Sequence, residues 1–339
     1  MKKISLIILL FSMFWIGCDI PVEIETQDQT NFTSFVLCEG NYGAGNAALW
    51  SFDPTEEQSE QLTLGGTALG DVGQSMMLDN HRLFTVINNS HKIEIFDVDE
   101  SISHLGTIQL NNASPRYIVA DENLGYVSCW NLTAILVLDL NNHVVIDTIE
   151  TPGMPEDLIL DGSSLFASIP MNSYWGSENS VVKISTETHS ITQTFETISG
   201  PSDMELIGSY LYVAGTYFGT NWTTYTGITK IDIINDIITT HADGANSHIK
   251  GDLVTLDESL YRLTTTGLAP VNNDLSLNMD QVLGNQTSAY SAWANSEYIY
   301  FGTTDYTAPD TVFITNHAGE LINQIVVGAI PRDFISISE

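Results

Sequence analysis

Short apolar runs with a period of two positions dominate the chain from residue 33 onward. Runs such as residues 84–87 and 126–128 are separated by clusters of Gly, Asn, Asp and Ser. Alternation over two positions is typical of β-strands, because successive side chains of a strand face opposite sides of its sheet. Long apolar faces with the helical period of about 3.6 residues are missing beyond the first twenty residues. The pattern therefore predicts an all-β protein.

The expected strands recur as a unit of roughly forty residues, the length range of repeat architectures. Residues 155–161 followed by 165–167 have the same order as residues 201–206 followed by 211–214. Each pair reads as an inner strand, a tight turn and a second strand, and two further apolar runs complete the unit.

One position can be aligned through all of the units. The aligned residues, which lie 39 to 49 positions apart, are Ser75, Tyr117, Asp157, Asp203, Asp252, Ser291 and Asp333. Seven units of four strands predict a seven-bladed β-propeller, in which each four-stranded blade buries its faces against its neighbours. Six or eight blades are the alternatives.

The two ends of the repeat region complement each other. Residues 330–337 have the signature of an inner strand but no second strand after it, whereas residues 35–37 and 49–53 lack an inner strand before them. We therefore expect one blade to be shared between the N- and C-terminal segments, which closes the ring and leaves no open sheet edge.

The first residues are typical of a targeting segment rather than of the fold. Lys2 and Lys3 precede an apolar run that ends at Ile16, and Gly17-Cys18 resembles the end of a bacterial lipobox. The resemblance implies a lipoprotein signal peptide at residues 1–17, a lipidated Cys18 opening an acidic tether at residues 18–32, and a propeller domain at residues 33–339. An ordinary secretory signal is the alternative. Acyl chains would anchor the protein to a membrane without crossing it.

The composition is strongly acidic, with 10 Lys and Arg against 42 Asp and Glu and a net charge of −32. Because 43% of the residues are apolar and only 15% are charged, the chain has enough apolar mass for a large core and is not a disordered acidic tail. A surface this acidic repels phosphate backbones, so nucleic acid is not an expected partner.

With the repeat established, the units resemble the YVTN or YncE-type propeller repeat. The opening segment, residues 35–49 with the run FVLCEGNYG, resembles the start of surface-lipoprotein propellers of Bacteroidetes. That group includes the BtuG-like partner of a TonB-dependent transporter, which captures cobalamin. The resemblance implies an outer-membrane lipoprotein, facing the cell exterior, with a TonB-dependent transporter as partner and cobalamin as a possible ligand.

The loops expected between second and third strands are unusually aromatic. In a propeller these loops share one face with the connections into the inner strands, around the central channel. This many rings suggests a ligand-binding surface for a flat or ring-shaped molecule, although rings that pack on one another to order long loops are the alternative. The candidate residues are Tyr42, Trp130, Tyr174, Trp175, Tyr217, Phe218, Trp222, Tyr225 and Tyr306.

Basic residues give a second signal at the same place. Arg116, Lys250 and Arg332 fall where inner strands begin, so their side chains are expected at the channel mouth. Three cations converging there would bind a carboxylate or phosphate of a ligand. The alternative is an ion network that offsets the aligned aspartates.

Catalysis finds little support in the sequence, and we expect a binding protein without a cofactor or metal rather than an enzyme. There is no nucleophile elbow and no metal-ligand spacing. Asp157 and Asp203 could act as paired carboxylates, but in such repeats we expect structural hydrogen-bond acceptors. Three hypotheses remain: a surface protein that binds a small ligand, an envelope scaffold that binds a polypeptide, and a lyase or hydrolase acting on a sugar or lactone.

Overall fold

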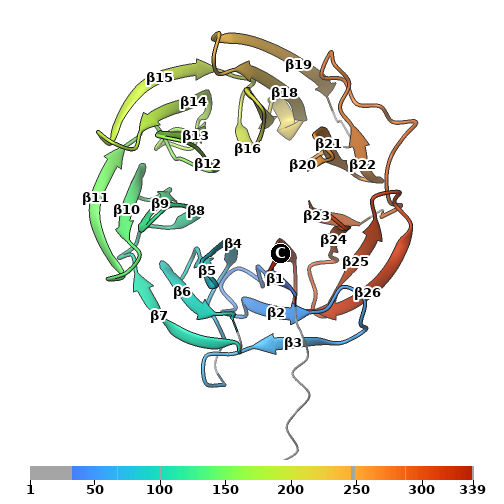
Figure 1. Cartoon of the computed structure of the whole chain (residues 1–339). Helices are drawn as coiled ribbons and strands as arrows, with labels where there is room; N and C mark the ends of the chain where they lie inside the picture. Colours follow the sequence, from blue (N-terminus) through green and yellow to red (C-terminus); the bar gives the residue numbers. More distant parts are fainter. Residues whose placement is uncertain (1–32, 67, 100, 246–248, 287, 338–339) are drawn as a thin grey trace, which may run out of the picture. The chain divides into compact units, whose positions relative to one another are not determined.

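Seven antiparallel sheets surround a central channel in the computed structural model (Figure 1). The structure describes residues 33–337 except 67, 100, 246–248 and 287. The signal peptide and tether expected at residues 1–32, including Cys18, lie outside the described residues. The predicted seven-bladed, all-β propeller is confirmed.

Blade 1 is the shared blade predicted from the sequence. Its strand order from the channel outward is β27 (Pro331–Ser336), β1 (Ser34–Cys38), β2 (Ala48–Phe52) and β3 (Ser59–Leu62). The C-terminal strand β27 pairs antiparallel with β1, and Phe334 lies opposite Val36. The last strand of the chain therefore supplies the innermost strand of the first blade and closes the ring.

Blades 2 to 5 each run from the channel outward in chain order. Blade 2 holds β4 (Gly73–Asp79), β5 (Arg82–Ile87), β6 (Lys92–Asp97) and β7 (Ser103–Gln109), and blade 3 holds β8 (Pro115–Asp121), β9 (Leu124–Cys129), β10 (Ala134–Asp139) and β11 (Val144–Glu150). Blade 4 holds β12 (Leu158–Asp161), β13 (Ser164–Met171), β14 (Ser177–Ser185) and β15 (Ser190–Glu196), and blade 5 holds β16 (Pro201–Ile207), β17 (Tyr210–Phe218), β18 (Thr224–Asp232) and β19 (Ile237–Ala245). A short 3-10 helix, η1 (Thr220–Trp222), lies between β17 and β18.

Blade 6 differs from the others in the described part of the chain. It has three strands, β20 (Ile249–Leu256), β21 (Ser259–Thr264) and β22 (Gly267–Pro270), and an isolated bridge from Leu268 to Leu283 takes the position of a fourth strand. Blade 7 is again four-stranded, with β23 (Ala289–Ala294), β24 (Tyr298–Thr303), β25 (Asp310–Asn316) and β26 (Leu321–Val327).

The core consists of apolar layers between neighbouring blades. Phe84 and Ile95 of blade 2 pack in one cluster with Ile118, Val127 and Leu136 of blade 3. Middle strands such as β5 are buried on both faces because a blade lies on either side, whereas the outer strand β11 is exposed at all positions but one. This explains why the middle strands are the most continuous apolar runs of the sequence.

Side-chain hydrogen bonds join consecutive blades into a closed ring around the channel. Four of the links are made by aligned aspartates, which accept a backbone N–H from the next inner strand, and three are made by serine hydroxyls that donate to a backbone carbonyl. The links are Asp157 to Met204 (2.7 Å), Asp203 to Leu253 (2.5 Å), Asp252 to Ala292 (3.0 Å), Asp333 to Met76 (2.6 Å), Ser75 to Arg116 (2.7 Å), Ser128 to Glu156 (2.5 Å) and Ser291 to Pro331 (2.7 Å). The expectation that the ring aspartates act as structural acceptors is confirmed.

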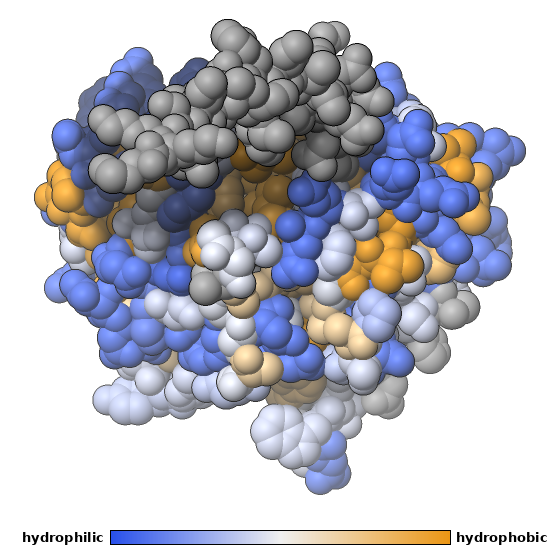
Figure 2. Space-filling model, turned by 90° about the horizontal axis from the view of Figure 1, so that it is seen from below, coloured by the Kyte–Doolittle hydropathy of each residue, from blue (hydrophilic) through white to orange (hydrophobic). Residues whose placement is uncertain are grey.

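One face of the molecule mixes hydrophilic surface with apolar patches. Seen from below relative to Figure 1, polar residues cover most of the visible surface and apolar residues form separate patches (Figure 2). Across the described ranges, no helix is both long and apolar enough to span a bilayer.

Candidate functional site

The inner strands begin on the same face as the loops between second and third strands. In blade 2, for example, the backbone N–H of Asn88 in such a loop donates to the carbonyl of Val72, just before β4 begins. The strand register shifts near the start of β4, β8, β16, β20 and β23, which marks a bulge there. A bulge adds one residue to a strand and re-aims a side chain, and one residue at the start of each inner strand faces the channel.

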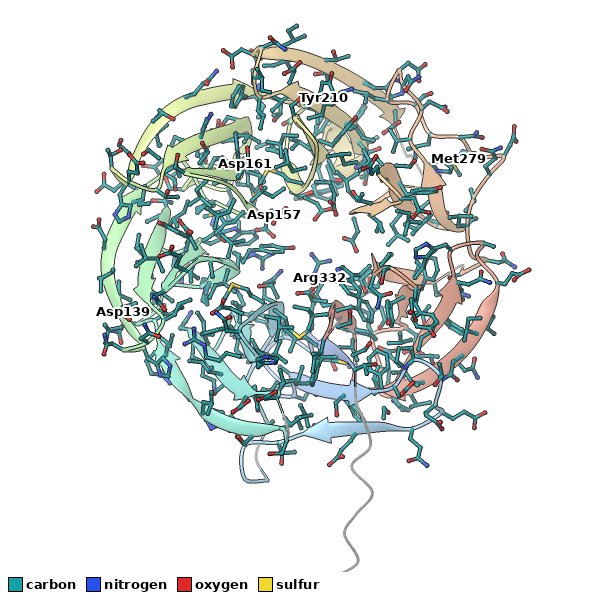
Figure 3. The ribbon with its side chains drawn as sticks, in the orientation of Figure 1. Asp139, Asp157, Asp161, Tyr210, Met279 and Arg332 are labelled. Atoms are coloured by element: carbon teal, nitrogen blue, oxygen red, sulfur yellow. The ribbon has the colours of Figure 1, made fainter. Side chains whose placement is uncertain are left out.

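These residues line a cavity of about 440 Å³ at the channel mouth, which we call the central well. Every blade contributes to it. Its lining residues are Glu39, Val72, Gln74, Arg116, Glu156, Ser202, Asp203, Gly251, Asp252, Tyr290, Tyr306 and Arg332. Arg332 and the ring residue Asp157 lie beside the channel, whereas Asp139 and Met279 lie at the periphery (Figure 3).

Each guanidinium nitrogen of Arg116 makes a hydrogen bond in the central well. Its Nε and one terminal nitrogen donate to the two carboxylate oxygens of Glu156, at 2.8 and 2.5 Å, and the other terminal nitrogen donates to Oε1 of Gln74 at 2.6 Å. Its guanidinium also lies over the ring of Trp130, 4.0 Å from the ring centre. A two-pronged pair of this kind is among the stronger charged hydrogen bonds.

Arg332 is also paired in the central well. One terminal nitrogen donates to the Tyr117 hydroxyl at 2.9 Å, the other lies 3.4 Å from Oδ1 of Asp252, and Nε lies 3.7 Å from Oε1 of Glu39. The hydroxyl of Tyr290 donates to the same Glu39 oxygen at 2.8 Å. Both arginines therefore lie at the channel mouth, within ion networks. Arg332 faces one aligned aspartate, Asp252, whereas the acidic partner of Arg116 is Glu156, which is not one of the aligned aspartates.

Acidic groups outnumber basic groups in the central well. Four carboxylates and two guanidinium groups line it, so the formal charge of these six groups is −2 when all are ionised. Burial raises the pKa of Asp203 well above its usual range, and the negative charges of Asp157 and Asp252 raise it further. Burial also raises the pKa of Glu39, although Arg332 opposes this shift. The well is a place where further negative charge is costly.

The predicted aromatic residues lie between the second and third strands of their blades, except that Tyr217 and Phe218 belong to the end of β17 and Tyr225 to the start of β18, and six of the nine are well exposed. Exposed fractions are 91% for Tyr174, 84% for Trp222, 82% for Tyr42, 64% for Trp175, 60% for Tyr306 and 58% for Phe218. Tyr306 reaches the central well itself. We call these six residues the aromatic rim.

Ring packing, the alternative reading of these loops, accounts for part of the pattern. Trp130 and Trp175 pack edge to face at 5.8 Å between ring centres, and Tyr217 and Tyr225 stack at 5.1 Å. Trp222 packs against Phe218 at 6.2 Å. The contacts order the loops and still leave wide ring faces open to solvent.

Some of the residues that line the well were predicted from the sequence and others were not. Of the predicted residues, Arg116, Arg332 and Tyr306 line it, and Trp130 lies behind Arg116. Lys250 belongs to β20, but its side chain lies outside the described residues. The ligand-binding role of all of these residues stays a prediction.

The missed residues share a simple signal. The position immediately before the aligned ring position faces the well in every blade, and it holds Gln74, Arg116, Glu156, Ser202, Gly251, Tyr290 and Arg332. Reading this position as one column would have identified most of the lining. Glu39 has no such signal, because it follows the second strand of blade 1.

Comparison with known proteins identifies the fold. No family model matches the chain, and no curated protein matches it in sequence. Among solved structures, a Bacteroides fragilis protein whose name proposes a 6-phosphogluconolactonase is 15% identical, with a TM-score of 0.64 over 91% of this chain and 99% of that chain. A Lactobacillus plantarum protein is 13% identical, with a TM-score of 0.64 over 89% and 98%.

A third match is virginiamycin B lyase from Staphylococcus aureus, which is 12% identical with a TM-score of 0.53 over 81% of this chain and 93% of that chain. At these identities the likeness shows the fold alone. The fold and the site define a seven-bladed β-propeller with a polar well at the channel mouth, an architecture compatible with ligand binding or with a role as an interaction scaffold.

Proposed function

We propose that this propeller captures a small ligand on the face that holds the aromatic rim and the central well. The observation that supports this most directly is the position of the exposed rings. Large aromatic side chains are expensive to leave in water, and six exposed ones lie at the connections between second and third strands on the face that holds the well, where Tyr306 lines the cavity itself. A ligand with a broad apolar surface would cover the rim while one polar group enters the well.

A corrinoid is the specific ligand we propose. A corrinoid is larger than a cavity of about 440 Å³, so it would rest on the rim instead of being enclosed. The support for this choice is the resemblance of the opening segment to the Bacteroidetes surface propellers. By the same resemblance, we propose that Cys18 is lipidated, that the propeller faces the cell exterior, and that it passes its ligand to a TonB-dependent transporter.

Isothermal titration calorimetry with cyanocobalamin tests the proposal. The chain from residue 19 onward is suitable, because the unit from Phe32 to Glu339 is compact and contains every described strand. We expect saturable binding, and we expect Trp175→Ala and Trp222→Ala each to weaken it about tenfold, as central aromatic contacts do. Tyr210→Ala is the control, because Tyr210 is also partly exposed but lies at the start of β17.

Absence of binding heat, or unchanged affinity in both tryptophan variants, would overturn the corrinoid proposal. Stable co-purification with a transporter in the absence of any small ligand would favour the scaffold hypothesis, in which the same aromatic rim contacts a polypeptide.

A further inference from the structure

We infer that the part of the ligand that enters the central well is an N–H donor group, a primary amide or an ammonium, and not a carboxylate or phosphate. The inference rests on the proposed function of the well as a binding site, but not on the ligand being a corrinoid. It reverses the expectation that the scarce basic residues mark an anion site.

The two guanidinium groups that line the well in the described part of the chain are already paired with acceptors. Each of the three guanidinium nitrogens of Arg116 donates a hydrogen bond, two to Glu156 and one to Gln74. Each guanidinium nitrogen of Arg332 faces an oxygen of Tyr117, Asp252 or Glu39 within 3.7 Å. An anion entering the well would have to break these pairs to gain a charged donor, and breaking a buried pair is costly.

Within the described ranges, two carboxylates of the well keep an oxygen that is free to accept a hydrogen bond from a ligand. Asp203 uses Oδ2 for the backbone N–H of Leu253, and Glu39 uses Oε1 for the hydroxyl of Tyr290. Among the described residues, Oδ1 of Asp203 and Oε2 of Glu39 accept no hydrogen bond, although both side chains line the well. Carboxylate oxygens in a partly buried cavity gain most from a donor supplied by the ligand.

Neutral hydrogen-bond donors also line the well. Gln74 accepts from Arg116 through Oε1, so its amide nitrogen faces away from that contact. This N–H and the hydroxyl of Ser202 are neutral donors in the lining. They would serve the carbonyl of a primary amide, whose N–H groups would bind the carboxylates. An ammonium would bind the same carboxylate oxygens.

The state of Asp203 supports the same preference. Its raised pKa reflects burial and the charges of Asp157 and Asp252, so a positive or donating group beside it stabilises its ionised form. A ligand carboxylate would add a further negative charge to the same cluster.

Three compounds that differ only in their polar group test this inference: phenethylammonium, phenylacetamide and phenylacetate. Titration followed by tryptophan fluorescence is informative because Trp130 packs against Arg116 in the lining. We expect the ammonium and the amide to bind about tenfold more tightly than the carboxylate, the difference that one hydrogen bond to a charged group supplies.

Asp203→Asn is the decisive variant, because its amide oxygen can still accept from Leu253 while an N–H₂ donor replaces the free carboxylate oxygen. We expect this variant to bind phenethylammonium more weakly and phenylacetate more tightly than the wild-type protein does. Asp161→Asn is the matched control: it removes the same charge from an exposed residue at the far end of β12, and it should leave the order of the three compounds unchanged.

Preferential binding of phenylacetate, or failure of both donor compounds to bind at millimolar concentration, would overturn the inference. The two proposals fail separately. If cyanocobalamin does not bind but the three compounds bind in the expected order, the corrinoid proposal is wrong and the inferred preference for a donor group stands. If cyanocobalamin binds equally well to the wild-type protein and to Asp203→Asn, and the three compounds bind with equal affinity, the inferred donor preference is wrong and the corrinoid proposal stands.

Discussion

Arg116 of blade 3 forms a two-pronged ion pair with Glu156 of the neighbouring blade 4, at 2.8 and 2.5 Å, at the mouth of the channel. Glu156 is buried and Arg116 nearly so. The pair therefore joins two neighbouring blades at the site where the ligand is proposed to bind. Because Glu156 balances the charge of Arg116, this arginine is less able to bind an anionic ligand than the sequence predicted.

Removal of one partner of this pair should destabilise the protein. Arg116→Ala leaves the Glu156 carboxylate buried without its donors, and we expect the free energy of unfolding to fall by about 3 kcal/mol. Urea unfolding measures the change. In a double-mutant cycle with Glu156→Ala, the double variant should be less destabilised than the sum of the single variants. Strict additivity would show that the pair contributes no coupling.

The ring link from blade 1 to blade 2 should also be measurable. The carboxylate of Asp333 accepts the N–H of Met76 at 2.6 Å and that of Phe334 at 2.9 Å. Asp333→Ala leaves both donors without this acceptor, so we expect a loss of about 2 kcal/mol in urea unfolding. Asp161→Ala, on the exposed end of β12, serves as control. Equal stability of the two variants would contradict a structural role for the ring aspartate.

Stability should fall as the pH rises from about 4 to about 7. Burial raises the pKa of Asp333 from 3.8 to about 6, and burial raises that of Glu205 from 4.5 to about 7. Because the folded-state values lie above the unfolded ones, both groups stabilise the fold at low pH and lose this contribution between about pH 4 and pH 7. The thermal unfolding midpoint should be higher near pH 5 than near pH 8.

Asp333→Asn should reduce this pH dependence, because the variant keeps an acceptor and has no titrating group. A midpoint that rises steadily over the same interval in the wild-type protein would contradict the prediction.

A buried arginine should hold the long hairpin of blade 5 in place. Arg262 is fully buried, and its guanidinium donates to the carbonyls of Gly227 at 2.7 Å and Gly215 at 3.2 Å. These glycines face each other at the base of the hairpin that extends to Phe218 and Trp222. Hydrogen exchange measures the effect of Arg262→Met, which has similar length and no donors.

We expect faster exchange of residues 215–227 in this variant, together with lower global stability. Uniform acceleration over all blades, with no added effect in the hairpin, would show that Arg262 stabilises the fold without positioning the aromatic rim.

Several features of the site could be predicted because they depend on the repeat. Arg116 and Arg332 precede aligned ring positions, and a recurring position in a propeller has a fixed place around the axis. The exposed rings of Trp175 and Trp222 could be predicted in the same way, since their loops follow second strands. What the repeat could not show is which partner each charge would have, because Arg116 and Glu156 lie 40 residues apart in the sequence.

The sequence by itself determined the class of fold, the number of blades and the closure of the ring by β27 and β1, because alternation and repetition are local properties that every blade expresses. Only the tertiary structure decided the character of the central well. Its residues come from all seven blades, and its charge distribution depends on how Glu39 and Asp252 meet Arg332 and how Glu156 meets Arg116. Such pairings depend on distances between strands far apart in the chain, and no local pattern encodes them.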